Sequence, residues 1–143
     1  MSASFCAFAG NEAFGARLRE QLVAGAPHVC LRKDRSGERD VRIEAPELGE
    51  WRGRTPVLVD DIISTARTMA AAARLLLGQG FAAPVCVGVH GVFAGDALET
   101  LQAAGISRVV TSNSIAHASN AIDASAPVAE AVDAMLTQVR REK

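Results

Sequence analysis

Aromatic residues and cysteine are scarce in this sequence. It contains no tyrosine, one tryptophan and 4% aromatic residues in all. The three cysteines, Cys6, Cys30 and Cys86, are odd in number and widely spaced, without a Cys-x-x-Cys pair. A disulfide framework or a structural zinc site needs cysteines paired at short spacings. These two classes are therefore disfavoured, and we expect free thiols in apolar surroundings.

An excess of charge of one sign is also missing. Lysine and arginine number 15 and aspartate and glutamate 16, so the formal net charge is −1. Proteins that bind nucleic acid, or that lie on anionic membranes, usually carry a basic excess. No apolar run approaches the roughly 20 residues of a spanning helix. We expect a cytoplasmic protein whose partners include neither a nucleic acid polymer nor a membrane.

The composition that remains is typical of one globular domain. The chain has 143 residues, of which 49% are hydrophobic and 22% charged. That balance is too apolar for a disordered chain and sufficient for a buried core. The sequence shows no internal repeat, low-complexity tract or linker. We therefore predict a single domain over residues 1–143.

Short apolar runs alternate with segments of helical periodicity along the chain. Strands are predicted at residues 4–9, 28–31, 57–59, 84–90 and 106–111, and helices at 13–23, 68–79, 95–104 and 128–140. The run at 84–90 is apolar throughout, as in strands covered on both faces, and its terminal His90 is interpreted as structural. This alternation, with short connections, predicts an α/β fold, a three-layer sandwich around a mostly parallel sheet.

The segment from residue 54 to residue 68 carries the strongest indication of chemistry. A buried-strand run, Val57-Leu-Val59, leads into Asp60 and Asp61, then into a Ser/Thr loop and an Ala/Leu-rich helix. Ligands of parallel α/β proteins bind at the carboxyl ends of strands, and helix N-termini bind phosphate. On the residues alone, the alternative is that Asp61 or Ser64 merely caps the helix.

A second segment, residues 32–43, is crowded with charge. It begins Arg32-Lys-Asp-Arg35, turns at Ser36-Gly37 and resumes apolar alternation at Val41 and Ile43. This pattern predicts a charged β-hairpin or flap. On charge alone, a solvated hairpin without a catalytic role is the simpler interpretation.

The string Val57-Leu-Val-Asp-Asp-Ile-Ile-Ser-Thr-Ala-Arg-Thr68 resembles the loop of type I phosphoribosyltransferase folds that binds phosphoribosyl pyrophosphate (PRPP). Its neighbours are similar to ribose-phosphate pyrophosphokinase, or PRPP synthetase, and in particular to the C-terminal half. The similarity runs from about His28 to Val132. It includes His90-Gly-Val-Phe-Ala-Gly95 and the polar segment Thr111–Asp123.

The resemblance implies a role for each residue of the two segments. Asp60 and Asp61 would hold the ribose hydroxyls, directly or through Mg²⁺. The 5-phosphate would be bound by the loop residues Ser64, Thr65, Ala66, Arg67 and Thr68. Lys33 and Arg35 match a Lys-x-Arg motif on a catalytic flap, where they would neutralise charge on the transferred diphosphoryl group.

The sequence departs from the family pattern in two places. Ala66-Arg67 stand where Gly-Gly is usual, which removes easy access to positive φ, so we expect a more helical loop with an added phosphate-facing charge. The segments that supply much of the ATP site, which belong to the N-terminal half of the family, are not visible. Gly10-Asn-Glu12 also lacks the pattern of the pyrophosphate loop. A shortened paralogue fits these departures.

The leading hypothesis is an enzyme that transfers diphosphate from ATP to ribose 5-phosphate with Mg²⁺. A phosphoribosyltransferase that uses PRPP is one alternative. Another is a non-catalytic PRPP-binding module or regulatory subunit that pairs with a full-length pyrophosphokinase. A phosphorylated receiver domain is disfavoured because its paired acids follow the first strand. The family resemblance also implies a homo-oligomer.

Overall fold

The computed structural model describes residues 3–8, 17, 27–35 and 41–141. Its strands are β1 (Ala3–Phe8), β2 (His28–Arg35), β3 (Val41–Glu44), β4 (Thr55–Ile63), β5 (Val85–Gly91), β6 (Arg108–Ser112) and β7 (Asn120–Ile122). They form one sheet in the order β3-β2-β1-β4-β5-β6-β7. All neighbouring pairs are parallel except β2 and β3, which are antiparallel. The predicted α/β fold with a mostly parallel sheet is confirmed.

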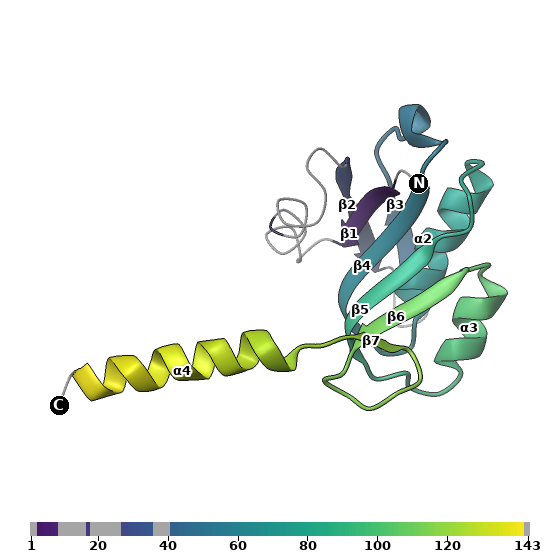
Figure 1. Cartoon of the computed structure of the whole chain (residues 1–143). Coiled ribbons are helices and arrows are strands. Elements are labelled where there is room, and N and C mark those ends of the chain that lie inside the picture. The colour runs from purple at the N-terminus through teal and green to yellow at the C-terminus, as the bar shows by residue number, and fades with distance from the viewer. Residues whose placement is uncertain (1–2, 9–16, 18–26, 36–40, 142–143) are drawn as a thin grey trace.

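Three α-helices accompany the sheet in the described part of the chain: α2 (Arg67–Gly78), α3 (Ala97–Ala103) and α4 (Ser125–Arg141). A short 3-10 turn, η1 (Gly49–Trp51), lies in the connection before β4. Figure 1 shows α2 and α3 along one side of the sheet, whereas α4 extends away from it. The helix predicted at 13–23 falls outside the described residues, Arg17 excepted. Among the described helices, none is long and apolar enough to cross a membrane.

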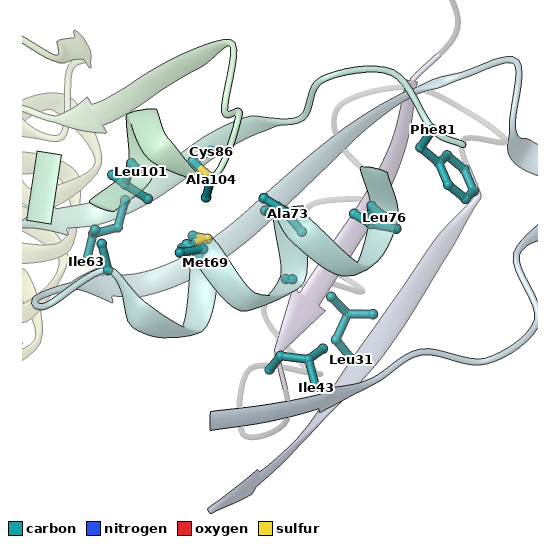
Figure 2. Packing of buried hydrophobic residues seen from close by; sticks show 14 of the residues in the cluster. Leu31, Ile43, Ile63, Met69, Ala73, Leu76, Phe81, Cys86, Leu101 and Ala104 are labelled. Carbon is teal, nitrogen blue, oxygen red and sulfur yellow. The ribbon is translucent and has the colours of Figure 1, made fainter. Parts of the chain in front are cut away.

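The core lies between α2 and the sheet. On α2 the buried side chains are Met69, Ala70, Ala72, Ala73 and Leu76. Leu58 and Cys86, which are paired in register on β4 and β5, belong to the same cluster, as do Leu101 of α3 and Ala104 directly after it. Figure 2 shows Met69 in the same part of the cluster as Ile63, Leu101 and Cys86. Burying one such large side chain contributes about 1.5–3 kcal/mol, so this contact fixes α2 against the sheet.

The base of the charged hairpin is part of the same core. Leu31 of β2 and Ile43 of β3 are buried in the cluster with α2 (Figure 2). The predicted strand at 28–31 and the first arm of the hairpin form a single strand, β2, which runs on to Arg35. The hairpin is therefore anchored at its base, which fixes the direction in which its charged arm leaves the sheet.

One strand departs from the sequence prediction. The sequence pattern predicts no strand at residues 120–122, but Asn120–Ile122 forms β7, paired in parallel with β6. The pairing register shifts between Thr111 and Ser112, so this edge is irregular. A polar residue can begin this strand because the Asn120 amide donates hydrogen bonds to the end of β6.

Candidate functional site

The two acids lie inside β4 and not after it. The strand predicted to end at Val59 continues through Asp60 and Asp61 to Ile63. Asp60 is half-buried and Asp61 is exposed. The Asp61 N–H donates to Asp60 Oδ1 at 3.1 Å, and the Ile62 N–H donates to Asp61 Oδ1 at 2.8 Å. Both carboxylates therefore lie near the carboxyl edge of the sheet, within the strand and not in the loop that follows it.

The strand does not keep strict side-chain alternation across these acids. Leu58 and Ile63 both enter the buried cluster beneath α2. In a regular strand, residues an odd number apart point to opposite faces. The alternation must therefore be interrupted between Leu58 and Ile63, which is where Asp60 and Asp61 lie. The two carboxylates are consequently not constrained to opposite faces of the sheet.

The entrance to α2 is formed by Ala66 in the left-handed conformation, with φ 61° and ψ 0°. The expectation of a more helical loop is wrong at this residue. Alanine keeps a positive φ here, at a cost of about 1–2 kcal/mol, because Ala66 is buried in the α2 core. The N-cap position belongs to Ala66, which makes no side-chain cap, and not to Asp61 or Ser64. The simple capping interpretation of these two residues therefore does not apply.

This entrance has the properties of an anion site. The first hydrogen bond within the helix runs from the Ala70 N–H to the Ala66 carbonyl at 2.9 Å. The N–H groups of residues 67–69 lie before this bond, in the first turn, where a helix has no carbonyl of its own to accept from them. The first turn holds no acidic residue. Ser64, Thr65 and Arg67 are exposed beside it, and Thr68 is half-buried. Helix N-termini of this kind favour phosphate through their N–H groups and dipole.

The segment after β5 braces the loop after β4. The N–H groups of Val92 and Phe93 both donate to the Ile63 carbonyl at 3.0 Å, and the Ala94 N–H donates to the Ser64 carbonyl at 3.1 Å. Phe93 has φ 46°. A Cβ at Gly91 would stand 2.6 Å from the Phe93 ring, so only glycine fits there. The sequence pattern of residues 90–95 does not reveal this brace, which joins two loops far apart in the chain.

Hydroxyl and amide side chains tie the ends of β5, β6 and β7 together. Thr111 Oγ1 lies 2.7 Å from Ser119 Oγ and accepts from Asn120 Nδ2 at 3.0 Å. Asn120 Nδ2 also donates to the Ser112 carbonyl at 2.6 Å. Within the described residues, no buried side-chain nitrogen or oxygen lacks a partner. Ser112 Oγ donates to the Val89 carbonyl of β5 at 2.6 Å. The network fixes the ends of β6 and β7, which β5 separates from the acids of β4.

Two histidines join this edge. His90 is exposed, and its Nδ1 lies 2.9 Å from Ser114 Oγ. His117 Nδ1 lies 2.8 Å from Ser119 Oγ, and its ring centroid is 4.4 Å from that of Phe93. These bonds agree with the structural role predicted for His90. They also connect the brace at Phe93 to the network of β6 and β7.

Lys33 and Arg35 lie on the arm of β2 that pairs with β3, opposite Ile43 and Val41 respectively. In the sheet, β1 separates this arm from β4. The side chains of Lys33 and Arg35 fall outside the part of the chain that the structure describes in that detail. Their catalytic role therefore stays a prediction.

The described residues contain no group of three or more His, Cys, Asp or Glu side chains that could hold a metal alone. Cys30 and Cys86 form no disulfide among the described residues, in agreement with the prediction. Burial raises the pKa of the Cys86 thiol to about 12, so it remains protonated at neutral pH. A thiolate is the form that binds metal or attacks a substrate, so the buried Cys86 thiol is a poor candidate for either role.

Comparison with known families decides the assignment. The profile of the phosphoribosyl synthetase-associated domain matches residues 41–141, which include β4, its acids and the entrance to α2. The chain belongs to this family. It is ribose-phosphate pyrophosphokinase-like, as the resemblance implied.

Curated relatives share clear sequence identity with it. The ribose-phosphate pyrophosphokinase of Sulfurisphaera tokodaii is 41% identical over 101 residues, which is 69% of this chain and 34% of the relative. That of Methanopyrus kandleri is 33% identical over 111 residues, 78% of this chain and 38% of the relative. The matches thus span only about a third of the length of these relatives.

Solved structures agree on the fold. The phosphoribosylpyrophosphate synthetase from Mycobacterium smegmatis aligns with a TM-score of 0.71 at 21% identity, over 96% of this chain and 46% of that one. The orotate phosphoribosyltransferase from Aeropyrum pernix aligns with a TM-score of 0.54 at 24% identity, over 77% and 58%. The pyrophosphokinase-like chain therefore has the type I phosphoribosyltransferase fold.

Proposed function

We propose that this pyrophosphokinase-like chain binds ribose 5-phosphate or PRPP at the end of β4. The 5-phosphate would lie at the entrance to α2, against the N–H groups of residues 67–69 and the hydroxyls of Ser64 and Thr65. Asp60 and Asp61 would accept hydrogen bonds from the ribose hydroxyls. The supporting observation is the left-handed Ala66, because a strained residue at a helix entrance is typical of ligand sites.

Mg²⁺ fits this arrangement as a shared cation. Carboxylate oxygens are its preferred protein ligands, and it usually binds one or two of them together with substrate oxygens. Asp60 and Asp61 supply such a pair, and the described residues add no third acidic ligand nearby. When bound, Mg²⁺ would neutralise charge on the substrate. The acids would then hold the cation and the ribose together.

The proposed reaction is transfer of diphosphate from ATP to ribose 5-phosphate. The 1-hydroxyl attacks the β-phosphorus, the bond from that phosphorus to the α-phosphate oxygen breaks, AMP leaves, and the hydroxyl proton passes to solvent. Lys33 and Arg35 would place positive charge against the transferred group. The matches span about a third of the curated relatives, so the activity of those whole enzymes is part of this proposal.

A second candidate is a regulatory or PRPP-binding subunit that pairs with a full-length pyrophosphokinase. It uses the same sugar-phosphate site without turnover. A phosphoribosyltransferase remains a prediction from the sequence, because the likeness to the orotate enzyme shows the fold alone. The cytoplasmic location predicted from composition also remains a proposal.

Calorimetry with ribose 5-phosphate and Mg²⁺ tests the site. We expect binding by the native chain and at least about tenfold weaker binding after the double change Asp60→Asn and Asp61→Asn, since hydrogen bonds to charged groups contribute about 1.5–3 kcal/mol each. Glu99→Gln, an exposed acid on α3, is the matched control and should bind normally. Absence of binding by the native chain would refute the proposal.

An assay of AMP release that depends on ribose 5-phosphate then separates the two candidates. Turnover by the purified chain identifies an enzyme. Binding without turnover, at any protein concentration, identifies a binding subunit.

A further inference from the structure

The turn between β6 and β7 holds the ring of His117 in one orientation. His117 Nδ1 accepts from the Ser119 N–H at 3.1 Å and lies 2.8 Å from Ser119 Oγ. The turn is also closed on itself, since the His117 N–H donates to Asn120 Oδ1 at 2.8 Å and the Asn120 N–H donates to the His117 carbonyl at 3.1 Å. The imidazole is half-buried. These contacts leave the ring little freedom to rotate.

The hydroxyl groups beside this turn donate in a single consistent direction. A backbone N–H can only donate, so His117 Nδ1 carries a lone pair and no proton. The Ser119 hydroxyl must then donate to Nδ1, and the Thr111 hydroxyl, 2.7 Å away, must donate to Ser119 Oγ. Thr111 Oγ1 in turn accepts from Asn120 Nδ2 at 3.0 Å. The hydrogen-bond network therefore assigns His117 as the neutral tautomer with its proton on Nε2.

The fixed imidazole packs against the ring of Phe93. The two ring centroids are 4.4 Å apart, and the ring planes are tilted by 39°. The Phe93 ring also occupies the space beside Gly91, where a Cβ would stand 2.6 Å from it. The backbone of Phe93 has φ 46°, a left-handed conformation that is unfavourable for a residue with a Cβ. The ring contacts thus hold Phe93 in a conformation that its own preference opposes.

This conformation of Phe93 directs the N–H groups of residues 92–94 toward the loop after β4. They donate to the carbonyls of Ile63 and Ser64 at distances of 3.0 to 3.1 Å. Ile63 is the last residue of β4, and Ser64 begins the loop that leads to Ala66 and α2. A change in the backbone of Phe93 would therefore release the loop at its first residue.

We propose that His117 is a positioning residue for the loop after β4. Ser119 holds it as the Nε2–H tautomer, its ring fixes the left-handed backbone of Phe93, and residues 92–94 then hold Ser64 where the 5-phosphate is bound. In this role His117 acts through Phe93 and does not touch the sugar phosphate. Its effect on the loop is independent of any ligand, whereas its effect on ribose 5-phosphate binding rests on the proposed function.

Amide hydrogen exchange of the full chain without ligand tests the effect on the loop. His117→Ala should raise the exchange rates of the Phe93 and Ala94 N–H groups on the order of 100-fold, because it removes the ring contact and both hydrogen bonds at Nδ1. The Ser107 N–H, which donates to the Pro84 carbonyl at the opposite end of the sheet, is the internal control and should change far less. An equal rise at Ser107 would reveal general destabilisation and overturn the proposal.

Two further variants separate the hydroxyl network from the ring. Ser119→Ala keeps the His117 ring and removes one donor to Nδ1, so it should raise the Phe93 and Ala94 rates about fivefold. Ser119→Thr retains the hydroxyl and should keep the native rates. Exchange in Ser119→Ala that equals that of the native chain would contradict the role of the network.

A matched histidine and a spectroscopic signature complete this test. His90→Ala removes a histidine of the same sheet edge whose Nδ1 lies 2.9 Å from Ser114 Oγ, and it should leave the Phe93 rate unchanged. Long-range proton–nitrogen NMR of the imidazoles should show a proton on Nε2 of His117 and none on Nδ1. A proton on Nδ1, or the same loosening in His90→Ala, would count against a specific role for His117.

Calorimetry with ribose 5-phosphate and Mg²⁺ tests the consequence for binding. His117→Ala should bind about tenfold more weakly, because the apparent affinity falls with the fraction of chains whose loop is held. Ser119→Thr should bind like the native chain. Unchanged affinity in His117→Ala, with exchange raised at residues 92–94, would refute the positioning role. If the native chain binds no ribose 5-phosphate, the proposed function fails, and the exchange rates still decide whether His117 holds the loop.

Discussion

Helices α2 and α4 have similar compositions and opposite surroundings. Both are rich in alanine with an apolar stripe, but α2 buries Met69, Ala73 and Leu76 against the sheet, whereas α4 buries nothing against the described residues. Their entrances differ as well. A strained backbone at Ala66 opens α2, and side-chain hydrogen bonds of Asn113 and Asp123 open α4. An amphipathic pattern thus predicts that a helix forms, but not what it packs against.

The largest expected difference is in the free energy of unfolding when one side chain of the apolar stripe is shortened in each helix. Leu76→Ala should lower the free energy of unfolding by about 2–5 kcal/mol, because Leu76 is fully buried and leaves a cavity. Val132→Ala should change it by about 0.5 kcal/mol or less, because Val132 is exposed on α4. Urea denaturation of both variants measures this. Equal losses would show that α4 packs on its own domain.

The brace beside the α2 entrance should be nearly as sensitive. Gly91→Ala would place a Cβ 2.6 Å from the Phe93 ring and 3.0 Å from Thr111 Cγ2, and we expect a loss of about 1–3 kcal/mol. Ribose 5-phosphate binding should weaken too, because residues 92–94 hold the loop. Gly78→Ala, where a Cβ meets nothing within 4 Å, is the control and should be neutral or slightly stabilising. Equal denaturation midpoints for the two variants would refute the brace.

The same chemical change at two places in α2 measures the strain at its entrance. Ala66→Gly should alter the free energy of unfolding by less than about 1 kcal/mol, because relief of the left-handed strain offsets the flexibility gained by the unfolded chain. Ala72→Gly, buried in the middle of the helix, should lose about 1 kcal/mol or more. Thermal denaturation compares them. If Ala66→Gly is the more damaging change, the entrance is not strained.

The smallest of these effects is expected at the entrance of α4, where the free energy of unfolding should depend on pH. Hydrogen bonds from the Ser125 hydroxyl, the Ser125 backbone and Asn113 lower the pKa of Asp123 from 3.8. Because the folded pKa is the lower one, the stabilisation is present above pH 3.8 and is lost as pH falls through the folded pKa. Carboxyl NMR titration should place the Asp123 pKa below 3.8 in the native chain. In Asn113→Ala it should move back toward the ordinary value, and an unchanged pKa would contradict the network.

Sequence reasoning predicted the elements whose hydrophobic period is strong. The predicted bounds of α2 lie one residue from those observed, because Met69, Leu76 and the alanines repeat at helical spacing. The predicted elements that the structure describes occur in the predicted order, and the acids lie near the carboxyl edge of the sheet, although they stand inside β4 and not after it. These features depend on local periodicity and on the general location of ligand sites at strand ends.

Other features depend on contacts between distant residues. β7 was missed because Asn120 pairs through its amide with Thr111 and Ser112, which no local pattern reveals. The left-handed Ala66 was missed because the intrinsic preference of alanine argues against it, and burial in the core overrides that preference. The brace at Phe93 requires knowledge that β4 and β5 are neighbours.

The buried thiol of Cys86 can report opening of the α2 core, so no added label is needed to detect that opening. Alkylating reagents react with the thiolate, so modification of Cys86 must wait for the core to open. The rate of that modification, localised by peptide mass spectrometry, therefore reports how often α2 separates from the sheet. One native cysteine therefore reports opening of this core in the intact chain.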